Sequence, residues 1–130
     1  MEQVIIMEKY KDEFNELSTC EEDCPILYAL NLIGKKWKLP ILWNLRDNNA
    51  LHYNQLKRKV TGITNTMLTK SLKELESDGL VLRQDFKTIP PSVEYKLTKR
   101  GEELIPALRE LYYWGKKQQE ISKTKDSKIK

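Results

Sequence analysis

The sequence predicts one mainly helical α+β domain, and three features of the chain point to it. Apolar residues recur at helical spacing through most of its length. A short turn around Gly62 separates two of these helical segments, and two strand-like stretches flank a stiff pair of prolines, Pro90 and Pro91. The chain has 130 residues, of which 39% are hydrophobic, so one domain with a core of its own is expected.

The first third of the chain predicts three helices. Residues 7–17 show an acidic amphipathic pattern, and residues 25–33 predict a second helix that starts at a proline and stops at Gly34. A third helix is expected from Trp37 to about Asp47. Its inward face would consist of Trp37, Ile41, Leu42 and Leu45.

The middle of the chain predicts a short strand and two helices joined by a turn. Residues 51–52 favour the strand, residues 53–60 a short helix, and residues 61–63 the turn. The helix over residues 64–78 should begin with a threonine cap and stop at the glycine that follows it. Its buried stripe would be Leu68, Leu72 and Leu75.

The last third predicts a β-hairpin and one long helix. Strand-like residues 80–86 and 93–97 flank the proline pair. Thr98 should cap a helix that runs to about Glu120 and is kinked by Pro106. The lysine-rich tail, residues 122–130, is expected to be frayed.

Basic residues are concentrated in the middle of the chain. The whole chain carries 23 Lys and Arg against 19 Asp and Glu, a net charge of +4. Residues 51–100 alone hold ten basic and five acidic side chains. This excess favours a polyanionic partner, although an ordinary solvated surface can also produce it.

The order of the predicted elements is that of a winged helix-turn-helix, in which the helix after the turn enters the major groove of DNA. With its leucines inward, the outer face of residues 64–78 carries short polar side chains and lysines, and no carboxylate before Glu74. Such groups can reach base edges and phosphates, and the hairpin, or wing, adds further donors. The candidate DNA contacts are Asn65, Thr66, Thr69, Lys70, Lys73, Arg83, Lys87 and Thr88.

An ordered series of short motifs runs through the chain: Cys24-Pro25, Gly34-Lys35-Lys36-Trp37, Ile41-Leu42, Tyr53-Asn54-Gln55-Leu56, Gly62-Ile63-Thr64, Met67-Leu68, Leu72-Lys73-Glu74-Leu75, Asp78-Gly79-Leu80, Pro90-Pro91-Ser92-Val93-Glu94-Tyr95, Leu97-Thr98 and Gly101. This series resembles the HxlR-type winged-helix regulators, which are relatives of the MarR group. The resemblance covers about residues 24–115 and rests on the order of the motifs, since none of them is specific alone.

The resemblance implies a homodimeric transcription factor that binds double-stranded DNA at a pseudo-palindromic operator, with half-site centres about 34 Å apart. It divides the chain into a dimerisation arm over residues 1–23, a DNA-binding core over 24–100, a dimerisation helix over 101–121 and a flexible tail over 122–130. An effector of unknown chemistry could occupy a cavity at the dimer interface. The expected interface residues, which could alternatively belong to the core of one subunit, are Phe14, Leu17, Leu108, Leu111, Tyr112 and Trp114.

The two cysteines flank an acidic stretch. Cys24 precedes a proline at a helix start, where free N–H groups favour the thiolate, but the acidic residues 21–23 oppose it. Some members of the resembled family sense oxidants, quinones or aldehydes at this position, so Cys24 is a possible sensor; a buried structural cysteine is the alternative. Cys20 could resolve an oxidised Cys24, within a subunit or across the dimer, or be an exposed bystander.

No other motif indicates a metal, a cofactor or an active site. The two cysteines and His52 lack the further ligands of a zinc pattern, and the chain has no phosphate-binding loop or nucleophile motif. A DNA-binding regulator rather than an enzyme is therefore expected. The remaining alternatives are a winged helix that binds proteins and, less favoured, a thiol-dependent enzyme. No signal peptide or membrane-spanning stretch is evident, so a cytoplasmic protein without a membrane partner is expected.

Overall fold

A computed structural model describes residues 24–129 of the chain. The described residues belong to two units, which divide after Lys35. In the first unit, α2 (Pro25–Ile33) starts with a proline at its first position, as predicted, and Cys24 before it has extended backbone. The acidic helix predicted over residues 7–17 lies outside the described residues.

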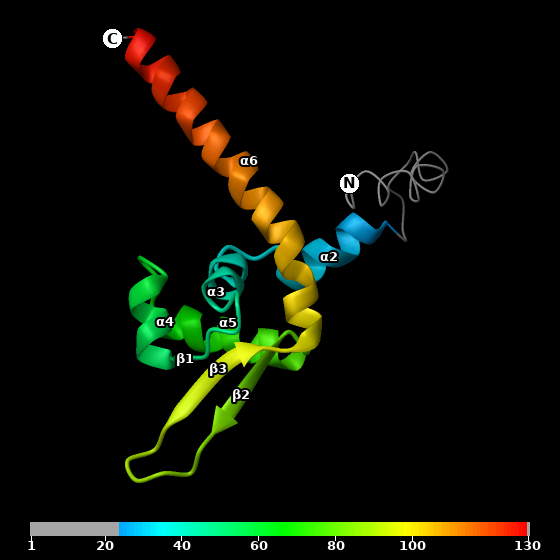
Figure 1. The fold of residues 1–130 in the computed structure, drawn as a ribbon, viewed down its shortest axis with the longest axis vertical. Coiled ribbons are helices and arrows are strands. Elements are labelled where there is room, and N and C mark those ends of the chain that lie inside the picture. Colours follow the sequence, from blue (N-terminus) through cyan, green and yellow to red (C-terminus); the bar gives the residue numbers. More distant parts are fainter. Residues whose placement is uncertain (1–23, 130) are drawn as a thin grey trace. The chain divides into compact units, whose positions relative to one another are not determined.

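The second unit confirms the predicted mainly helical α+β fold with its winged helix-turn-helix order (Figure 1). The strands form one antiparallel sheet in the order β1-β3-β2, so the short β1 is a third strand beside the hairpin. Within this sheet Leu51 pairs with Tyr95, and Arg83 pairs with Tyr95 from the other side. The elements are α3 (Lys38–Asn44), β1 (Leu51–His52), α4 (Tyr53–Lys59), α5 (Asn65–Ser77), β2 (Val81–Asp85), β3 (Val93–Leu97) and α6 (Lys99–Ile129).

A compact apolar core sets the orientation of α5. Its predicted stripe is buried, as are Ile41 and Leu42 of α3 and Leu56 of the short α4. Because burial of a leucine side chain contributes about 1.5–3 kcal/mol, this stripe fixes which face of α5 points inward. The buried apolar residues of these three helices and the segment after α3 are Leu68, Leu72, Leu75, Ile41, Leu42, Leu45 and Leu56.

The predicted caps hold the ends of α5 and α6. The Thr64 hydroxyl accepts a hydrogen bond from the Met67 N–H at 3.1 Å, and the Thr98 hydroxyl accepts one from the Gly101 N–H at 3.1 Å. Gly79 follows α5 with a φ of 75°, a conformation that glycine adopts without strain. Position 101 must also be a glycine, because a Cβ there would collide with the carbonyl oxygen of Leu80.

Two helix lengths differ from the sequence prediction. The third helix is shorter than expected, because the chain turns after Leu45 and both Asp47 and Asn48 have positive φ. The last helix is longer: α6 continues to Ile129, so the predicted frayed tail over residues 122–130 is helical as far as that residue. No proline or glycine follows Gly115, and the predicted end rested only on the fading apolar pattern.

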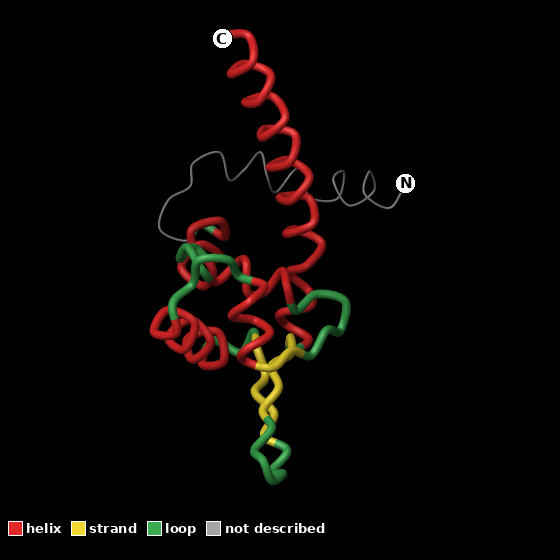
Figure 2. The backbone as a smooth tube through the Cα atoms, turned by 90° about the vertical axis from the view of Figure 1, so that its left-hand side faces the viewer, coloured by secondary structure: helices red, strands yellow, loops and turns green. Residues whose placement is uncertain are grey.

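The wing and α6 extend from opposite ends of the helical core of the second unit (Figures 1 and 2). Pro106 lies inside α6, where the sequence analysis expected it. Among the described helices, none is long and apolar enough to cross a membrane.

Candidate nucleic-acid interface

The outer face of α5 presents the polar side chains that the sequence assigns to DNA. Five of the eight predicted DNA contacts lie on α5. All five side chains are exposed, and together they line a surface hollow of about 520 Å³. Asn65 and Thr66 stand at the start of the helix, where backbone N–H groups also face outward. This face therefore combines hydrogen-bonding groups with positive charge. Its members, called the reading face below, are Asn65, Thr66, Thr69, Lys70 and Lys73.

Tyr53, at the start of α4, belongs to this surface although sequence reasoning did not assign it there. Its hydroxyl lies 3.0 Å from the carbonyl oxygen of Asn65, 3.3 Å from Asn65 Oδ1 and 3.1 Å from Thr69 Oγ1. A phenol has one proton, so it can donate to one Asn65 oxygen and accept from the Thr69 hydroxyl. Tyr53 thus orients two polar groups of the reading face. No local sequence signal indicated this role, because Tyr53 is the first residue of α4 and its partners lie on α5, beyond the turn.

His52 fastens the start of α4 to the wing. Its Nδ1 lies 2.8 Å from the carbonyl oxygen of Val93, and its Nε2 lies 3.6 Å from a carboxylate oxygen of Glu94. Its backbone N–H donates to the side-chain oxygen of Gln55 at 2.8 Å. The sequence offered no partner for this histidine, because both ring contacts come from a strand some forty positions later.

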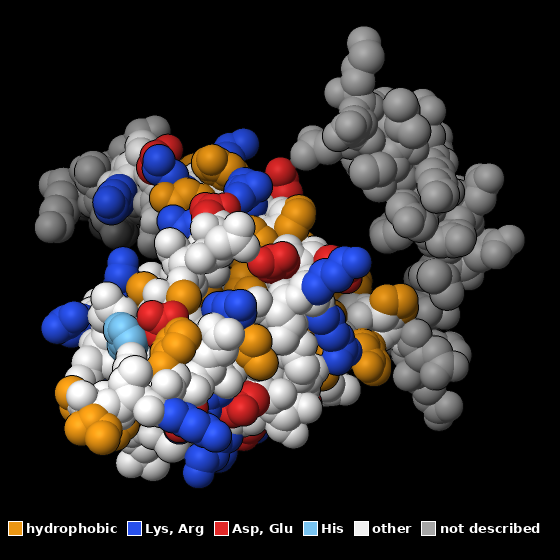
Figure 3. Space-filling view, turned by 60° about the horizontal axis from the view of Figure 1, so that its bottom comes forward, with side chains coloured by type: hydrophobic (Ala, Val, Ile, Leu, Met, Phe, Trp, Pro, Cys, Tyr) orange, Lys and Arg blue, Asp and Glu red, His pale blue; other side chains and the backbone are white. Residues whose placement is uncertain are grey.

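The wing presents its predicted donors to solvent. Arg83 on β2, and Lys87 and Thr88 in the loop, are all exposed. The loop also carries Ile89, which is fully exposed and which the sequence analysis did not single out. Figure 3 shows the side of the molecule from which the wing projects, with Lys and Arg side chains in several places on it.

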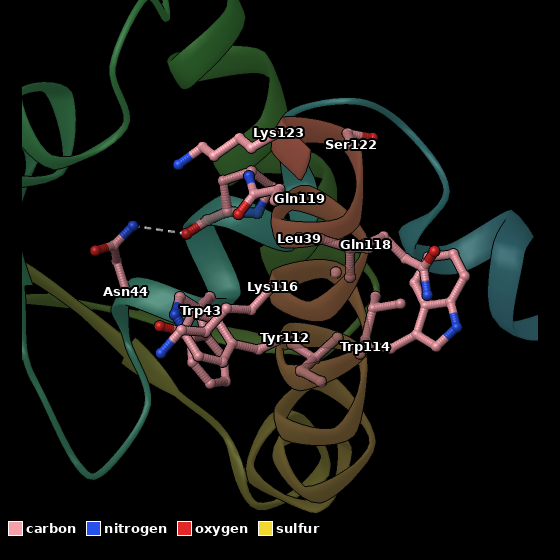
Figure 4. A pocket seen from close by; sticks show the side chains of 14 residues that line it. Leu39, Trp43, Asn44, Tyr112, Trp114, Lys116, Gln118, Gln119, Ser122 and Lys123 are labelled. Atoms are coloured by element: carbon pink, nitrogen blue, oxygen red, sulfur yellow. Dashed lines mark hydrogen bonds between the residues drawn. The ribbon is translucent and has the colours of Figure 1, made fainter. Parts of the chain in front are cut away.

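A second surface lies between α3 and α6, where an open groove has a volume of about 1050 Å³. Within it Trp43 and Tyr112 stack with ring centres 5.2 Å apart, and the Arg46 guanidinium lies 4.2 Å from the Trp43 ring centre. Figure 4 shows Trp43 and Tyr112 side by side, with Trp114 on the opposite side of α6. The groove is largely apolar, with Lys116 and Lys123 among its lining residues.

The expected dimer-interface residues fall into three groups. Leu111, Tyr112 and Trp114 are 50%, 47% and 63% exposed and line the groove. Leu108 is only 6% exposed, so most of its surface belongs to the core of one subunit, which was the alternative. Phe14 and Leu17 lie outside the described residues.

Cys24 is 8% exposed and disulfide-bonded, and it directly precedes α2. Its carbonyl oxygen accepts a hydrogen bond from the Tyr28 N–H at 3.1 Å. Cys20 lies outside the described residues.

The fold and the exposed face of α5 define a winged helix-turn-helix DNA-binding domain. Residues 32–123 match the HxlR-like helix-turn-helix family. The chain belongs to this family, and it is a helix-turn-helix transcriptional regulator.

Relatives of known sequence or structure agree with this assignment. The chain is 42% identical over 113 residues to an HTH-type transcriptional regulator of Halalkalibacterium halodurans, covering 87% of this chain and 96% of that protein. It is similar to a MarR-family regulator of Porphyromonas gingivalis, with a TM-score of 0.70, 34% identity, and coverage of 73% and 92% of the two chains.

A third relative is the redox regulator HypR, of which two forms are known. The reduced form has a TM-score of 0.71 and 34% identity, with coverage of 77% of this chain and 98% of that one. The oxidised form has a TM-score of 0.68 and 37% identity, with coverage of 72% and 96%.

Replacing Tyr53 with phenylalanine should weaken sequence discrimination without unfolding the protein. The change removes one exposed hydroxyl, so Asn65 and Thr69 lose their common partner while the ring remains. One such hydrogen bond is worth about 1 kcal/mol, so the preference at the base pairs that these residues contact should fall about fivefold. Competition binding on single-base operator variants measures this. An unchanged preference profile would show that Tyr53 does not act on the reading face.

Proposed function

We propose that the protein is a dimeric regulator that binds double-stranded DNA sequence-specifically and so controls transcription from a nearby promoter. The observation that carries this proposal is the reading face: five exposed polar or basic side chains lie on the side of α5 opposite its buried leucines. A winged helix that binds only proteins would not need polar and basic side chains together on this exposed face of α5. As its target is genomic DNA, we expect the protein to act in the cytoplasm.

The reading face divides by chemistry. Asn65, Thr66 and Thr69 carry short side chains near the start of α5, the part of a recognition helix that meets base edges. Lys70 and Lys73 follow one and two turns later, where long flexible cations can meet phosphates. Arg83, Lys87 and Thr88 extend the contact along the wing. This arrangement supports base reading at one end of the helix and backbone binding along the rest.

The phosphate contacts and the base contacts predict different losses of DNA affinity when their side chains are removed. Lys70→Ala and Lys73→Ala should weaken binding to every duplex, and each should make the dependence of log K on log salt shallower, because fewer phosphates are neutralised. The parent slope should be about −4 to −7. Asn65→Ala and Thr66→Ala should instead cost about 1–3 kcal/mol on the operator alone.

Gel-shift titrations on an operator and on a random duplex, at several salt concentrations, measure these losses. Lys117→Ala, a change to an exposed lysine on α6, is the control and should leave both affinities unchanged. If all four reading-face variants lose affinity equally on both duplexes, the division is wrong. If the parent prefers no duplex over random DNA, the proposed function is wrong.

The groove supports a homodimer. Leu111, Tyr112 and Trp114 leave much of their apolar surface exposed along a helix that projects from the core (Figure 2). Aromatic side chains are enriched at protein interfaces and dominate their binding energy. A second copy related by two-fold symmetry would cover this surface and present two reading faces to one duplex.

Trp114→Ala should weaken this dimer. Truncation of a central interface tryptophan costs about 2 kcal/mol or more, so the dimer dissociation constant should rise at least about tenfold. Sedimentation at several protein concentrations measures it, with Lys117→Ala as the exposed control on the same helix. A parent chain that stays monomeric at tens of micromolar would contradict the proposal, as would a Trp114→Ala variant that associates like the parent.

We also propose that oxidation at Cys24 alters operator binding, with Cys20 as its resolving partner. Two thiols would join in one disulfide, and their two protons and two electrons would pass to an oxidant such as a quinone or diamide. The disulfide at Cys24 and the likeness to the redox regulator HypR support this proposal.

Diamide should change the operator affinity of the parent at least about fivefold, the lower end of ordinary coupling between two sites, and a thiol reductant should reverse the change. Cys24→Ser should not respond. Cys20→Ser tests the partner and should also lose the reversible response. Equal operator affinity of the reduced and the diamide-treated parent would end the sensing proposal and leave a structural disulfide.

A further inference from the structure

Lys38 is the only charged residue that is buried among residues 24–124, where the structure describes side-chain burial. It is the first residue of α3 and is 3% exposed. Its Nζ lies 3.1 Å from Glu74 Oε2 and 3.8 Å from Asp78 Oδ2, two carboxylates at the end of α5. Glu74 therefore does not lie freely on the outer face of α5, as its sequence position suggested, but turns toward α3.

This ion pair joins other contacts at the same end of α5. The Arg100 guanidinium, on α6, donates to the carbonyl oxygen of Asp78 at 2.7 Å, and the Thr98 hydroxyl donates to that of Gly79 at 2.6 Å. The C-terminal end of α5 is thus fastened to α3 and α6, while the base-reading residues stand at its other end. Asp78 receives contacts from both helices.

A buried ion pair restrains the helix in a way that leucines do not. Apolar packing is non-directional and tolerates small rotations of α5 about its stripe. A buried ammonium must keep its carboxylates within bonding distance, because losing them leaves a desolvated charge. About 15 Å separates this end of the helix from its first residues, so a tilt of about 4° would displace Asn65 by about 1 Å.

We propose that Lys38 is a positioning residue for operator recognition: by holding Glu74 and Asp78 it sets the rotation and tilt at which α5 presents the reading face. This inference rests on the proposed function, because it concerns how α5 meets DNA. A displacement of about 1 Å is enough to break hydrogen bonds to base edges but not the looser attraction to phosphates. Lys38 therefore acts on the preference for the operator and not on affinity for DNA in general.

The test is the ratio of operator affinity to random-duplex affinity at one salt concentration. Lys38→Met fills the same space without charge and should lower the ratio about tenfold or more, the loss expected from one misplaced base contact. Lys38→Arg keeps a cation near both carboxylates and should restore the ratio to within about threefold of the parent. The charge changes themselves affect both duplexes alike, so they cancel in the ratio.

A matched pair on α5 covers the case in which Lys38→Met does not fold. Glu74→Met removes a carboxylate that contacts Lys38, whereas Glu76→Met removes an exposed one that forms none of the ion pairs found among the described residues. Glu74→Met should lower the ratio, and Glu76→Met should leave it unchanged. Circular dichroism and thermal unfolding establish that each variant is folded.

The outcomes separate the two claims. If the parent shows no operator preference, the proposed function has failed. If the parent shows one and the folded Lys38→Met and Glu74→Met variants keep it, Lys38 does not position the helix. Equal losses for Glu74→Met and Glu76→Met would also overturn the proposal, because they would trace the effect to helix charge alone.

Discussion

The arrangement of the whole DNA-binding unit depends on the packing of α5 through its three leucines. Leu68, Leu72 and Leu75 are buried, and they share the core with two apolar residues of α3 and one of α4. Because the three leucines occupy one side of the helix, the other side is left for polar groups, and every residue assigned to DNA on α5 is exposed there. The chemistry of the surface thus follows from the packing of the core beneath it.

Helix α3 contacts both the reading helix α5 and the groove beside α6. One end of α3 carries Lys38, which reaches the end of α5, while Trp43 farther along lines the groove with α6. The helix that packs beneath the reading helix therefore also contributes to the surface where a second subunit is proposed to bind. Contacts on both sides of a short rigid element give a physical connection between dimer geometry and the angle of α5.

Local signals allowed most of the fold to be predicted. Period, caps and turn residues located α4, α5 and the hairpin, and the exposure of the reading face follows from helical periodicity alone. Contacts between residues far apart in sequence could not be predicted: Tyr53 with Thr69, His52 with Val93, and Lys38 with Glu74. Each depends on how two elements cross, which no local pattern specifies. The end of α6 was misplaced because fading amphipathicity is not a stop signal.

The most direct test of the account is to locate α5 on DNA. Duplexes selected by the protein from a random pool should share a pseudo-palindromic site, and methylation of guanine N7 in the major groove should interfere with binding. The account predicts two such patches whose centres lie about 10–10.5 base pairs apart, one for each reading face of the dimer. A single patch, or interference confined to the minor groove and backbone, would contradict it.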